Sequence, residues 1–238
     1  MRYADMVKQS LVDYPGEIAA VLFTRSCNLR CPFCHNPDLL IKPKILVKPI
    51  DIEDVLGFLV QRRGFLDGVV ISGGEPTLHD ELAQDIRRIK SLGFLVKLDT
   101  NGTNPALLQN LIDQNCLDYV AMDIKAPLEF RKYRAACGKL SRAGFFSIRS
   151  SVHLLRNTGI KVEFRTTVVP ALHTPEDIAE ISEYITGAEE YTLQQFNPRV
   201  TLEPGYANVV PYSKDEMQSI ADRCAAYVKE VRVVNING

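Results

Sequence analysis

The chain has 238 residues, of which 46% are hydrophobic and 24% charged, the balance of a globular protein that can bury a sizeable core in one large domain or two small ones. Its 28 lysines and arginines face 29 aspartates and glutamates, and the formal net charge of -1 argues against the cationic excess of most nucleic-acid-binding proteins. No apolar run approaches the ~20 residues of a membrane helix, and the N-terminus lacks the pattern of a secretion signal, so we expect no membrane contact and a cytoplasmic location.

Short apolar, β-branched runs alternate along the chain with longer helical patterns. The runs that predict strands are Ile18–Thr24, Gly68–Ser72, Phe94–Asp99, Tyr119–Asp123, Val162–Val169, Tyr191–Phe196 and, more briefly, Val231–Val234. The segments that predict helices are Asp51–Arg63, Asp80–Leu92, Pro105–Asn115, Ser141–Asn157, Pro175–Ile185 and Lys214–Lys229. Such alternation indicates an α/β fold, a parallel sheet covered by helices, in the form of a partial (β/α)6 TIM-like barrel. Since no repeat or Pro/Gly/Ser-rich linker interrupts the pattern, we expect a single domain over residues 1–238.

Polar motifs follow five of the six main strands at the same end. They are the cysteine segment Cys27–Cys34, Gly73-Gly74-Glu75-Pro76, Asp99-Thr100-Asn101-Gly102, Asp123-Ile124-Lys125 and Gln195-Phe196-Asn197-Pro198. In barrels of alternating strands and helices, the active site lies at the carboxyl ends of the strands. The sequence therefore predicts chemistry on one rim.

The six cysteines are unevenly placed, and a reducing cytoplasm argues against disulfides. Three of them are scattered among small or apolar residues and are expected to be buried as small hydrophobes: Cys116, Cys137 and Cys224. Cys27, Cys31 and Cys34 crowd into one segment, and three thiolates there can bind a metal. A structural zinc site needs a fourth ligand, and His35, directly after Cys34, is poorly placed to supply it. A four-iron cluster on three cysteines leaves one iron open for a substrate.

The Cys27-x3-Cys31-x2-Cys34 spacing, with Phe33 before the last cysteine and the Gly73–Pro76 motif downstream, resembles the signature of radical S-adenosylmethionine enzymes. Further segments make the chain similar to the activating enzymes of glycyl-radical proteins, in particular the compact activating proteins of anaerobic ribonucleoside-triphosphate reductases, with pyruvate formate-lyase activating enzymes as near relatives. Those segments are Asp13-Tyr14-Pro15-Gly16, Cys34-His35-Asn36, Leu98–Gly102, Met122–Lys125 and Phe164–Pro170.

The resemblance implies a radical SAM core in which the three cysteines hold a [4Fe-4S] cluster, with S-adenosylmethionine chelating the fourth iron. It places Gly73 and Gly74 where the backbone approaches the methionine ammonium closely, with Glu75 supporting that loop or the ammonium. It also implies that Asp99, Thr100 and Asp123 frame a monovalent cation, and that Lys125 binds the cofactor carboxylate. The remaining candidate cofactor contacts are Phe33 at the adenine, Asn101, Arg165 and Asn197.

Simpler interpretations stand beside these. The Gly73–Pro76 motif alone is a turn, and Asp99–Gly102 alone is a helix-capping turn. Arg165 has an ion pair with a neighbour such as Glu163 as its alternative. The histidines outside the cysteine segment, His79, His153 and His173, are expected to be surface or capping residues.

The reaction implied by the resemblance is the reductive cleavage of S-adenosylmethionine, followed by hydrogen abstraction from a backbone glycine of a partner, most closely an anaerobic ribonucleotide reductase. Because no second cysteine quartet is present, a separate flavodoxin or ferredoxin is the expected electron donor. The alternatives are an activase of another glycyl-radical enzyme of the pyruvate formate-lyase type, a radical enzyme acting on a small molecule or peptide, and two classes outside enzymes, an iron–sulfur electron carrier and a zinc-stabilised binding module.

Charge is segregated along the second half of the chain. From Lys125 to Lys161 there are nine basic residues and one acid, and from Pro170 to Glu190 there are six acids and no lysine or arginine. Two interpretations are open: a pair of solvated helical faces, or a docking surface for a partner protein or an acidic electron donor.

Overall fold

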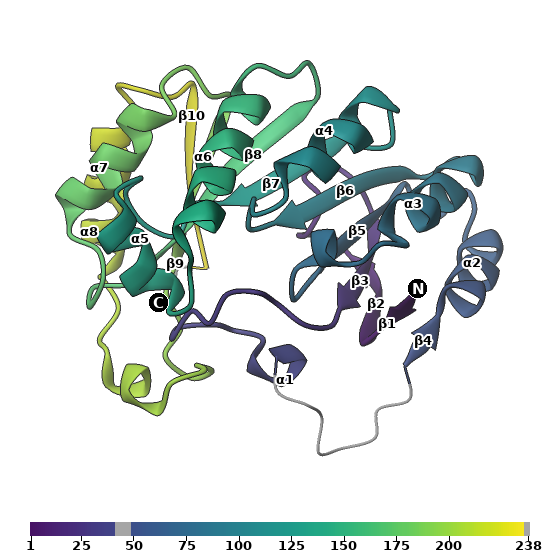
Figure 1. The fold of residues 1–238 in the computed structure, drawn as a ribbon, viewed down its shortest axis with the longest axis horizontal. Helices are drawn as coiled ribbons and strands as arrows, with labels where there is room; N and C mark the ends of the chain where they lie inside the picture. The colour runs from purple at the N-terminus through teal and green to yellow at the C-terminus, as the bar shows by residue number, and fades with distance from the viewer. Residues whose placement is uncertain (41–48, 236–238) are drawn as a thin grey trace. The chain divides into compact units, whose positions relative to one another are not determined.

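The computed structural model describes residues 1–40 and 49–235 (Figure 1). The chain forms two compact units made of interleaved segments, and its last passage from the first unit to the second lies within strand β7 (Tyr119–Asp123). The first unit comprises Met1–Cys27, Asp38–Thr100 and Asn104–Val120, and the second comprises Asn28–Pro37, Asn101–Thr103 and Ala121–Gly238. The expectation of a single domain over 1–238 stays a prediction, and its positions 41–48 and 236–238 lie outside the described residues.

The strands of the first unit are ordered β6-β5-β3-β2. The central three are parallel to one another, namely β3 (Ala19–Thr24), β5 (Gly68–Gly73) and β6 (Leu95–Thr100), and β2 (Asp5–Ser10) runs antiparallel to β3 at the edge. A separate antiparallel pair joins β1 (Arg2–Tyr3) to β4 (Ile50–Asp51). The helical elements are α1 (Pro37–Leu40), α2 (Ile52–Gln61), η1 (Pro76–Leu78), α3 (Leu82–Ser91) and α4 (Pro105–Asp113).

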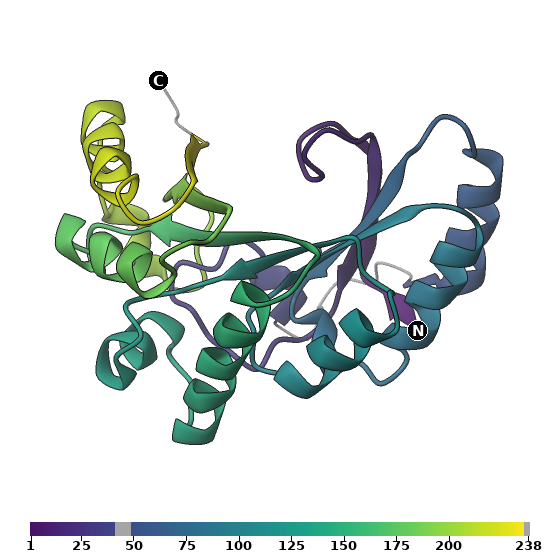
Figure 2. The same cartoon turned by 90° about the horizontal axis from the view of Figure 1, so that it is seen from above.

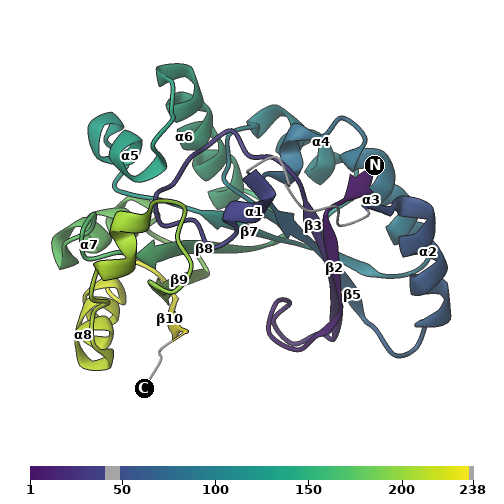
Figure 3. The same ribbon diagram turned by 90° about the horizontal axis from the view of Figure 1, so that it is seen from below.

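The second unit follows the order β10-β9-β8-β7, and β8 (Lys161–Val168), β9 (Glu190–Gln195) and β10 (Glu230–Val234) are parallel. Its helical elements are α5 (Phe130–Cys137), α6 (Arg142–Arg156), α7 (Pro175–Tyr184), η2 (Pro204–Asn208) and α8 (Lys214–Cys224). Figures 2 and 3 show α7 and α8 beside the strands of this unit. Both of these helices begin with a capping box, in which Thr174 and Ser213 exchange hydrogen bonds with the third residue of the helix.

The cores of both units come from the apolar runs that predicted the strands. Ala19–Leu22 and Val69–Ile71 are buried on both faces of the sheet, as expected of parallel strands that carry helices outside them. In the second unit Phe164 and Tyr191 are buried from β8 and β9. Among the described residues no helix is long and apolar enough to cross a membrane.

The predicted α/β class with a mostly parallel sheet is confirmed, and each predicted strand is present within about a residue or two at its ends. The helix predicted over Lys214–Lys229 is wrong at its C-terminus, because α8 ends at Cys224. The chain turns there, and the backbone groups of Tyr227 and Lys229 bond to Gly187 and Ala188 instead of continuing the helix. Helix α5 and strand β2 were not predicted.

Candidate active site

The cysteine segment leaves β3 and is held by backbone hydrogen bonds. All three thiols are free; Cys31 is buried, and Cys27 and Cys34 are half-buried. Within the second unit, Cys34 N donates to Cys31 O at 3.1 Å, which closes a tight turn around Phe33. Pro32 O accepts from Glu203 N at 2.9 Å, so the turn is also anchored to the segment before η2.

Helix α5 supports this segment from its C-terminus. Arg30 N donates to Cys137 O at 2.8 Å, and a Cβ on Gly138, whose φ is +65°, would lie 2.3 Å from Arg30 O. The pKa of the Cys31 thiol is lowered, first by a hydrogen bond with the Cys137 thiol and then, against the effect of burial, by the Lys125 ammonium. The lowered pKa favours the thiolate, which is the form that binds metals. Cys137 is buried as expected, as are Cys116 and Cys224.

Three predicted residues of the second unit meet in one ion-paired group. Lys125 Nζ lies 2.8 Å from Asp123 Oδ2, and Arg165 Nε lies 3.0 Å from Asp123 Oδ1. Burial would raise the pKa of Asp123, but its attraction to Arg165 and Lys125 outweighs burial and lowers it to about 2. Burial would lower the pKa of Lys125, and the Asp123 carboxylate more than reverses this. The group therefore stays charged, with two cations around one anion.

The backbone beside this group is fixed by two buried side chains. Lys125 N donates to the hydroxyl of Tyr133 at 3.1 Å, and Lys125 O lies 2.9 Å from His173 Nε2. His173 Nδ1 accepts from Val169 N at 3.0 Å, so its neutral tautomer carries the proton on Nε2 and donates it to Lys125 O. The expectation that His173 is a surface or capping residue is wrong, because it is 1% exposed and bonded on both nitrogens. Burial lowers its pKa.

The glycine motif of the first unit makes a close approach that only glycine permits. A Cβ on Gly74 would lie 1.9 Å from Ser26 O, and one on Gly73, whose φ is +110°, would lie 2.5 Å from Thr24 N. Gly74 N and the amide of Glu75 donate to the carbonyls of Thr24 and Ser26 at 3.0 and 2.8 Å. The backbone here is thus pressed against the residues that lead into Cys27.

Glu75 is buried and serves this turn. Its Oε1 accepts hydrogen bonds from Thr77 N at 3.1 Å, Thr77 Oγ1 at 2.5 Å and Thr100 Oγ1 at 2.8 Å. Of the two roles expected for Glu75, these contacts favour support of the loop. The hydroxyl of Thr100 donates to Glu75, and its predicted contact with a cation stays a prediction.

The other predicted residues have the following places. Asp99, at the end of β6, accepts from Ser72 Oγ at 2.9 Å and lies 3.4 Å from the ammonium of Lys97, a residue that sequence analysis missed. Asn101 Nδ2 donates to Asn28 Oδ1 at 3.0 Å, so it contacts the cysteine segment. Asn197 Oδ1 accepts from Arg199 N at 3.0 Å in a turn.

The two charge runs of the second half are partly paired with each other. Lys132 of α5 contacts Asp177 and Glu180 of α7 at 2.7 and 3.1 Å. Arg156, at the end of α6, donates to the carbonyls of Tyr184 and Thr186. These contacts give both runs a structural role between helices.

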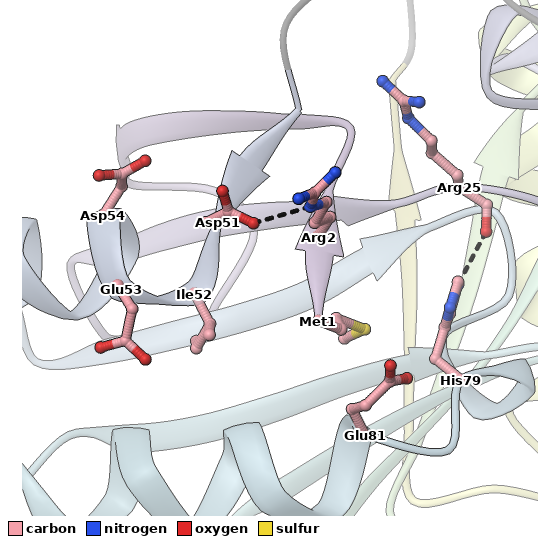
Figure 4. Close-up of a pocket in the computed structure, with 9 residues that line it drawn as sticks. All are labelled: Met1, Arg2, Arg25, Asp51, Ile52, Glu53, Asp54, His79 and Glu81. Carbon is pink, nitrogen blue, oxygen red and sulfur yellow. Dashed lines mark hydrogen bonds and ion pairs between the residues drawn. The ribbon is translucent and has the colours of Figure 1, made fainter.

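A pocket of about 690 Å³ lies elsewhere in the first unit, between the N-terminus of α2 and η1 (Figure 4). Its lining mixes the basic Arg2 and Arg25 with the acidic Asp51, Glu53, Asp54 and Glu81, and His79 bonds to the carbonyl of Arg25 at 2.9 Å. None of the predicted site residues lines it. Its mixed charge favours no particular class of ligand.

In residues 1–40 and 49–235, no three His, Cys, Asp or Glu side chains form a preassembled metal-binding group. The donor chemistry nevertheless fits an iron–sulfur cluster, because three free thiols lie on one short segment and iron–sulfur clusters take thiolates. The glycine turn fits close packing against the residues that lead into this segment, because its absent side chains let Thr24 and Ser26 approach its backbone.

Comparison with known proteins decides the family. Residues 21–185 match the family model of the radical SAM superfamily. The chain belongs to this superfamily. It is 33% identical to a candidate glycyl-radical enzyme activating enzyme of Methanocaldococcus jannaschii, over 98% of this chain and 95% of the relative. It is also 31% identical to the pyruvate formate-lyase-activating enzyme of Clostridium pasteurianum, over 84% and 83% of the two chains.

Within the superfamily, the chain therefore belongs to the glycyl-radical enzyme activating enzymes, which confirms the resemblance drawn from its motifs. Membership implies S-adenosylmethionine and a [4Fe-4S] cluster as cofactors and a glycyl-radical enzyme as partner. A radical SAM methyltransferase from Sphaerobacter thermophilus has the same fold, with a TM-score of 0.71 at 16% identity over 93% of this chain and 68% of that one. Streptococcus suis SuiB gives a TM-score of 0.69 at 15% identity, and the chain spans about half (48%) of its length.

Proposed function

We propose that this activating enzyme generates the glycyl radical of an anaerobic ribonucleotide reductase. The likeness to an activating enzyme along nearly the whole of both chains, 98% of this one and 95% of the relative, supports the activase function, and the resemblance of the motifs to the compact activating proteins of these reductases is the reason for the named partner. The compact chain adds no cysteine-rich insert: of its six cysteines, three lie in the Cys27–Cys34 segment and the others are buried singly.

Cys27, Cys31 and Cys34 are the proposed ligands of the cluster. Once bound, the cluster and S-adenosylmethionine supply the one-electron chemistry that removes a hydrogen atom from the partner's glycine. Burial keeps the Cys31 sulfur away from water, and its lowered pKa favours the thiolate, the form that binds metals.

Lys125 is the proposed partner of the cofactor carboxylate. Its ammonium is held charged by Asp123, and its backbone is fixed on both sides by Tyr133 and His173. Arg165 also pairs with Asp123, so the group formed by Lys125, Arg165 and Asp123 carries a surplus positive charge that suits an anionic ligand. At the end of β6, Asp99 is proposed to face the cofactor, as the resemblance to the activating enzymes implies, and the monovalent cation that this resemblance implies stays part of the proposal.

The glycine turn is proposed to bind the methionine ammonium through backbone carbonyls, with Glu75 and Thr100 holding the turn. Phe33, Asn101 and Asn197 are proposed to shape the adenine side through the turns that they close. The electron is proposed to come from a separate flavodoxin or ferredoxin, since the three cysteines outside the segment are scattered and buried.

The function is tested by electron paramagnetic resonance of the reductase after anaerobic incubation with reconstituted protein, reductant and S-adenosylmethionine. The proposal predicts a glycyl doublet that is lost with Cys31→Ala and kept with Cys116→Ala. A silent reductase would contradict the named partner. A doublet on pyruvate formate-lyase in a parallel incubation would then establish the second candidate, which the 31% identity to a pyruvate formate-lyase-activating enzyme favours. Turnover of a small molecule with both proteins silent would contradict the activase function in this chain.

A further inference from the structure

The ammonium of Lys97 lies buried in the first unit, in the strand that ends with Asp99. Its side chain is 3% exposed, and lysines are seldom buried to that extent without partners. Nζ donates to Asp13 O at 2.6 Å, lies 3.4 Å from Asp99 Oδ1, and sits 5.4 Å from the ring centroid of Tyr119. A carbonyl, a carboxylate and an aromatic face thus compensate the buried charge.

The position of Lys97 in β6 explains why it reaches Asp99. Residues two apart on a strand point to the same face, so the ammonium lies one layer below the carboxylate. Ser72 Oγ on β5 donates to the other oxygen, Asp99 Oδ2, at 2.9 Å. The hydrogen bond from Ser72 therefore orients Oδ2, and the Lys97 ammonium at 3.4 Å makes an ion-pair contact with the buried Oδ1 and not a hydrogen bond.

Lys97 also ties Asp99 to a distant turn. Asp13 is 84 residues away in sequence, in the turn after β2. That turn is shaped by Ser10 Oγ, which accepts from the amides of Val12 and Asp13 at 3.2 Å. Next to Asp13, the ring of Tyr14 packs edge-on against Tyr119 at 5.7 Å, and Tyr119 is the ring that lies beside the ammonium.

We propose that Lys97 is a positioning residue for the binding of S-adenosylmethionine, acting through Asp99. It does not touch the cofactor; it holds the Asp99 carboxylate in the orientation in which that group meets the cofactor site. The proposal rests on the function proposed above and on the place of Asp99 in it.

The test is a double-mutant cycle on S-adenosylmethionine affinity, measured by isothermal titration calorimetry on reconstituted, unreduced protein without any partner. Lys97→Met should weaken binding roughly tenfold, an indirect effect of releasing the Asp99 carboxylate from its ion pair. Asp99→Asn should weaken it at least as much, and the double variant should bind no more weakly than Asp99→Asn alone. Iron content should remain at the wild-type level in all three variants.

The control is Lys161→Met, the same change at the exposed start of β8, which should bind the cofactor as the wild type does. If Lys97→Met does not fold, Lys97→Gln replaces it in the same cycle, because an amide can still donate to Asp13 O but carries no charge toward Asp99. Wild-type affinity in the Lys97 variant, or effects of the two substitutions that add, would overturn the proposal. So would wild-type affinity in Asp99→Asn. Because no partner is present, failure here is separable from failure to produce a glycyl radical.

Discussion

Two lysine–aspartate pairs, one in each unit, use the same spacing in opposite order. In β6 Lys97 precedes Asp99 by two residues, and at the end of β7 Lys125 follows Asp123 by two. The first lysine is 3% exposed and lies 3.4 Å from its carboxylate, and the second is 16% exposed and lies 2.8 Å from its own. In each pair, the residue that comes first in the sequence lies deeper along the strand. Lys97 is therefore buried beneath Asp99, whereas Lys125 lies beyond Asp123, past the end of β7. The inner lysine positions the carboxylate, and the outer lysine, while paired with Asp123, is the one proposed to meet the cofactor carboxylate.

The largest expected effect comes from removing the anion of the outer pair. Asp123→Asn leaves Lys125 and Arg165, which are 16% and 12% exposed, without their shared carboxylate. We expect activity to fall at least about 100-fold and the free energy of unfolding to fall by about 2–3 kcal/mol. Urea unfolding and the glycyl-radical yield measure these changes. Glu176→Gln, which breaks the exposed pair with Arg223, is the control and should alter neither.

Matched substitutions of the two lysines should separate their roles. Lys125→Met is expected to weaken S-adenosylmethionine binding about 100-fold, because a direct charge-assisted contact is lost, with a small loss of stability since Arg165 still pairs with Asp123. Lys97→Met is expected to weaken binding only about tenfold and to lower the melting temperature more. Calorimetric titration and thermal unfolding of both variants test this order. The reverse order in either quantity would contradict the distinction between the two pairs.

The outer pair also depends on how its backbone is held. Tyr133→Phe removes the hydroxyl that accepts a hydrogen bond from the amide of Lys125, and that amide then loses its acceptor. We expect a loss of about 1–2 kcal/mol in the free energy of unfolding and a severalfold loss of cofactor affinity. Tyr184→Phe removes a hydroxyl that bonds the exposed Arg149, and it should change neither quantity. Equal effects of the two substitutions would show that Tyr133 has no specific role.

The smallest expected effect is a pH dependence through His173. Burial lowers its pKa from the ordinary 6.5, so the unfolded chain binds a proton more readily than the folded one. The stabilising effect of neutral His173 is therefore complete above about pH 6.5 and is lost as pH falls toward the lowered value. Protonation would add an N–H at Nδ1. That N–H would face the Val169 N–H, from which Nδ1 accepts a hydrogen bond in the neutral ring. His173→Asn should flatten the loss of melting temperature between about pH 7 and 5, and His153→Asn, at an exposed position, should leave it unchanged.

The elements predicted from sequence are those whose own residues carry the pattern. The strands around Val69 and Val120 are continuous apolar runs, and α7 begins with a recognisable cap at Thr174. Helix α5 was missed because its sequence, Phe-Arg-Lys-Tyr-Arg-Ala-Ala-Cys, offers only a small apolar face, Tyr133, Ala136 and Cys137.

The parts of the site that could not be predicted depend on contacts distant in sequence. Asp123, Lys125 and Arg165 were expected at the cofactor from the resemblance, and the structure adds the ion pairs of both cations with Asp123. In the sequence, Lys97 looked like an ordinary strand residue. Its ammonium can be buried because it donates to the backbone carbonyl of Asp13, 84 residues away. His173 is likewise explained by Lys125, 48 residues away. A lysine inside an apolar strand, two residues before a motif aspartate, was the signal available in the sequence.

The most direct test of the account follows the hydrogen atom itself. The partner reductase, labelled with deuterium on the Cα atoms of its glycines, is incubated anaerobically with this protein, reductant and unlabelled S-adenosylmethionine, and the 5′-deoxyadenosine is examined by mass spectrometry. The account predicts one deuterium atom in that product, at a level matching the radical formed, none with Cys31→Ala, and a much lower yield with Lys125→Met at subsaturating S-adenosylmethionine. Unlabelled 5′-deoxyadenosine formed alongside a radical-free reductase would contradict it.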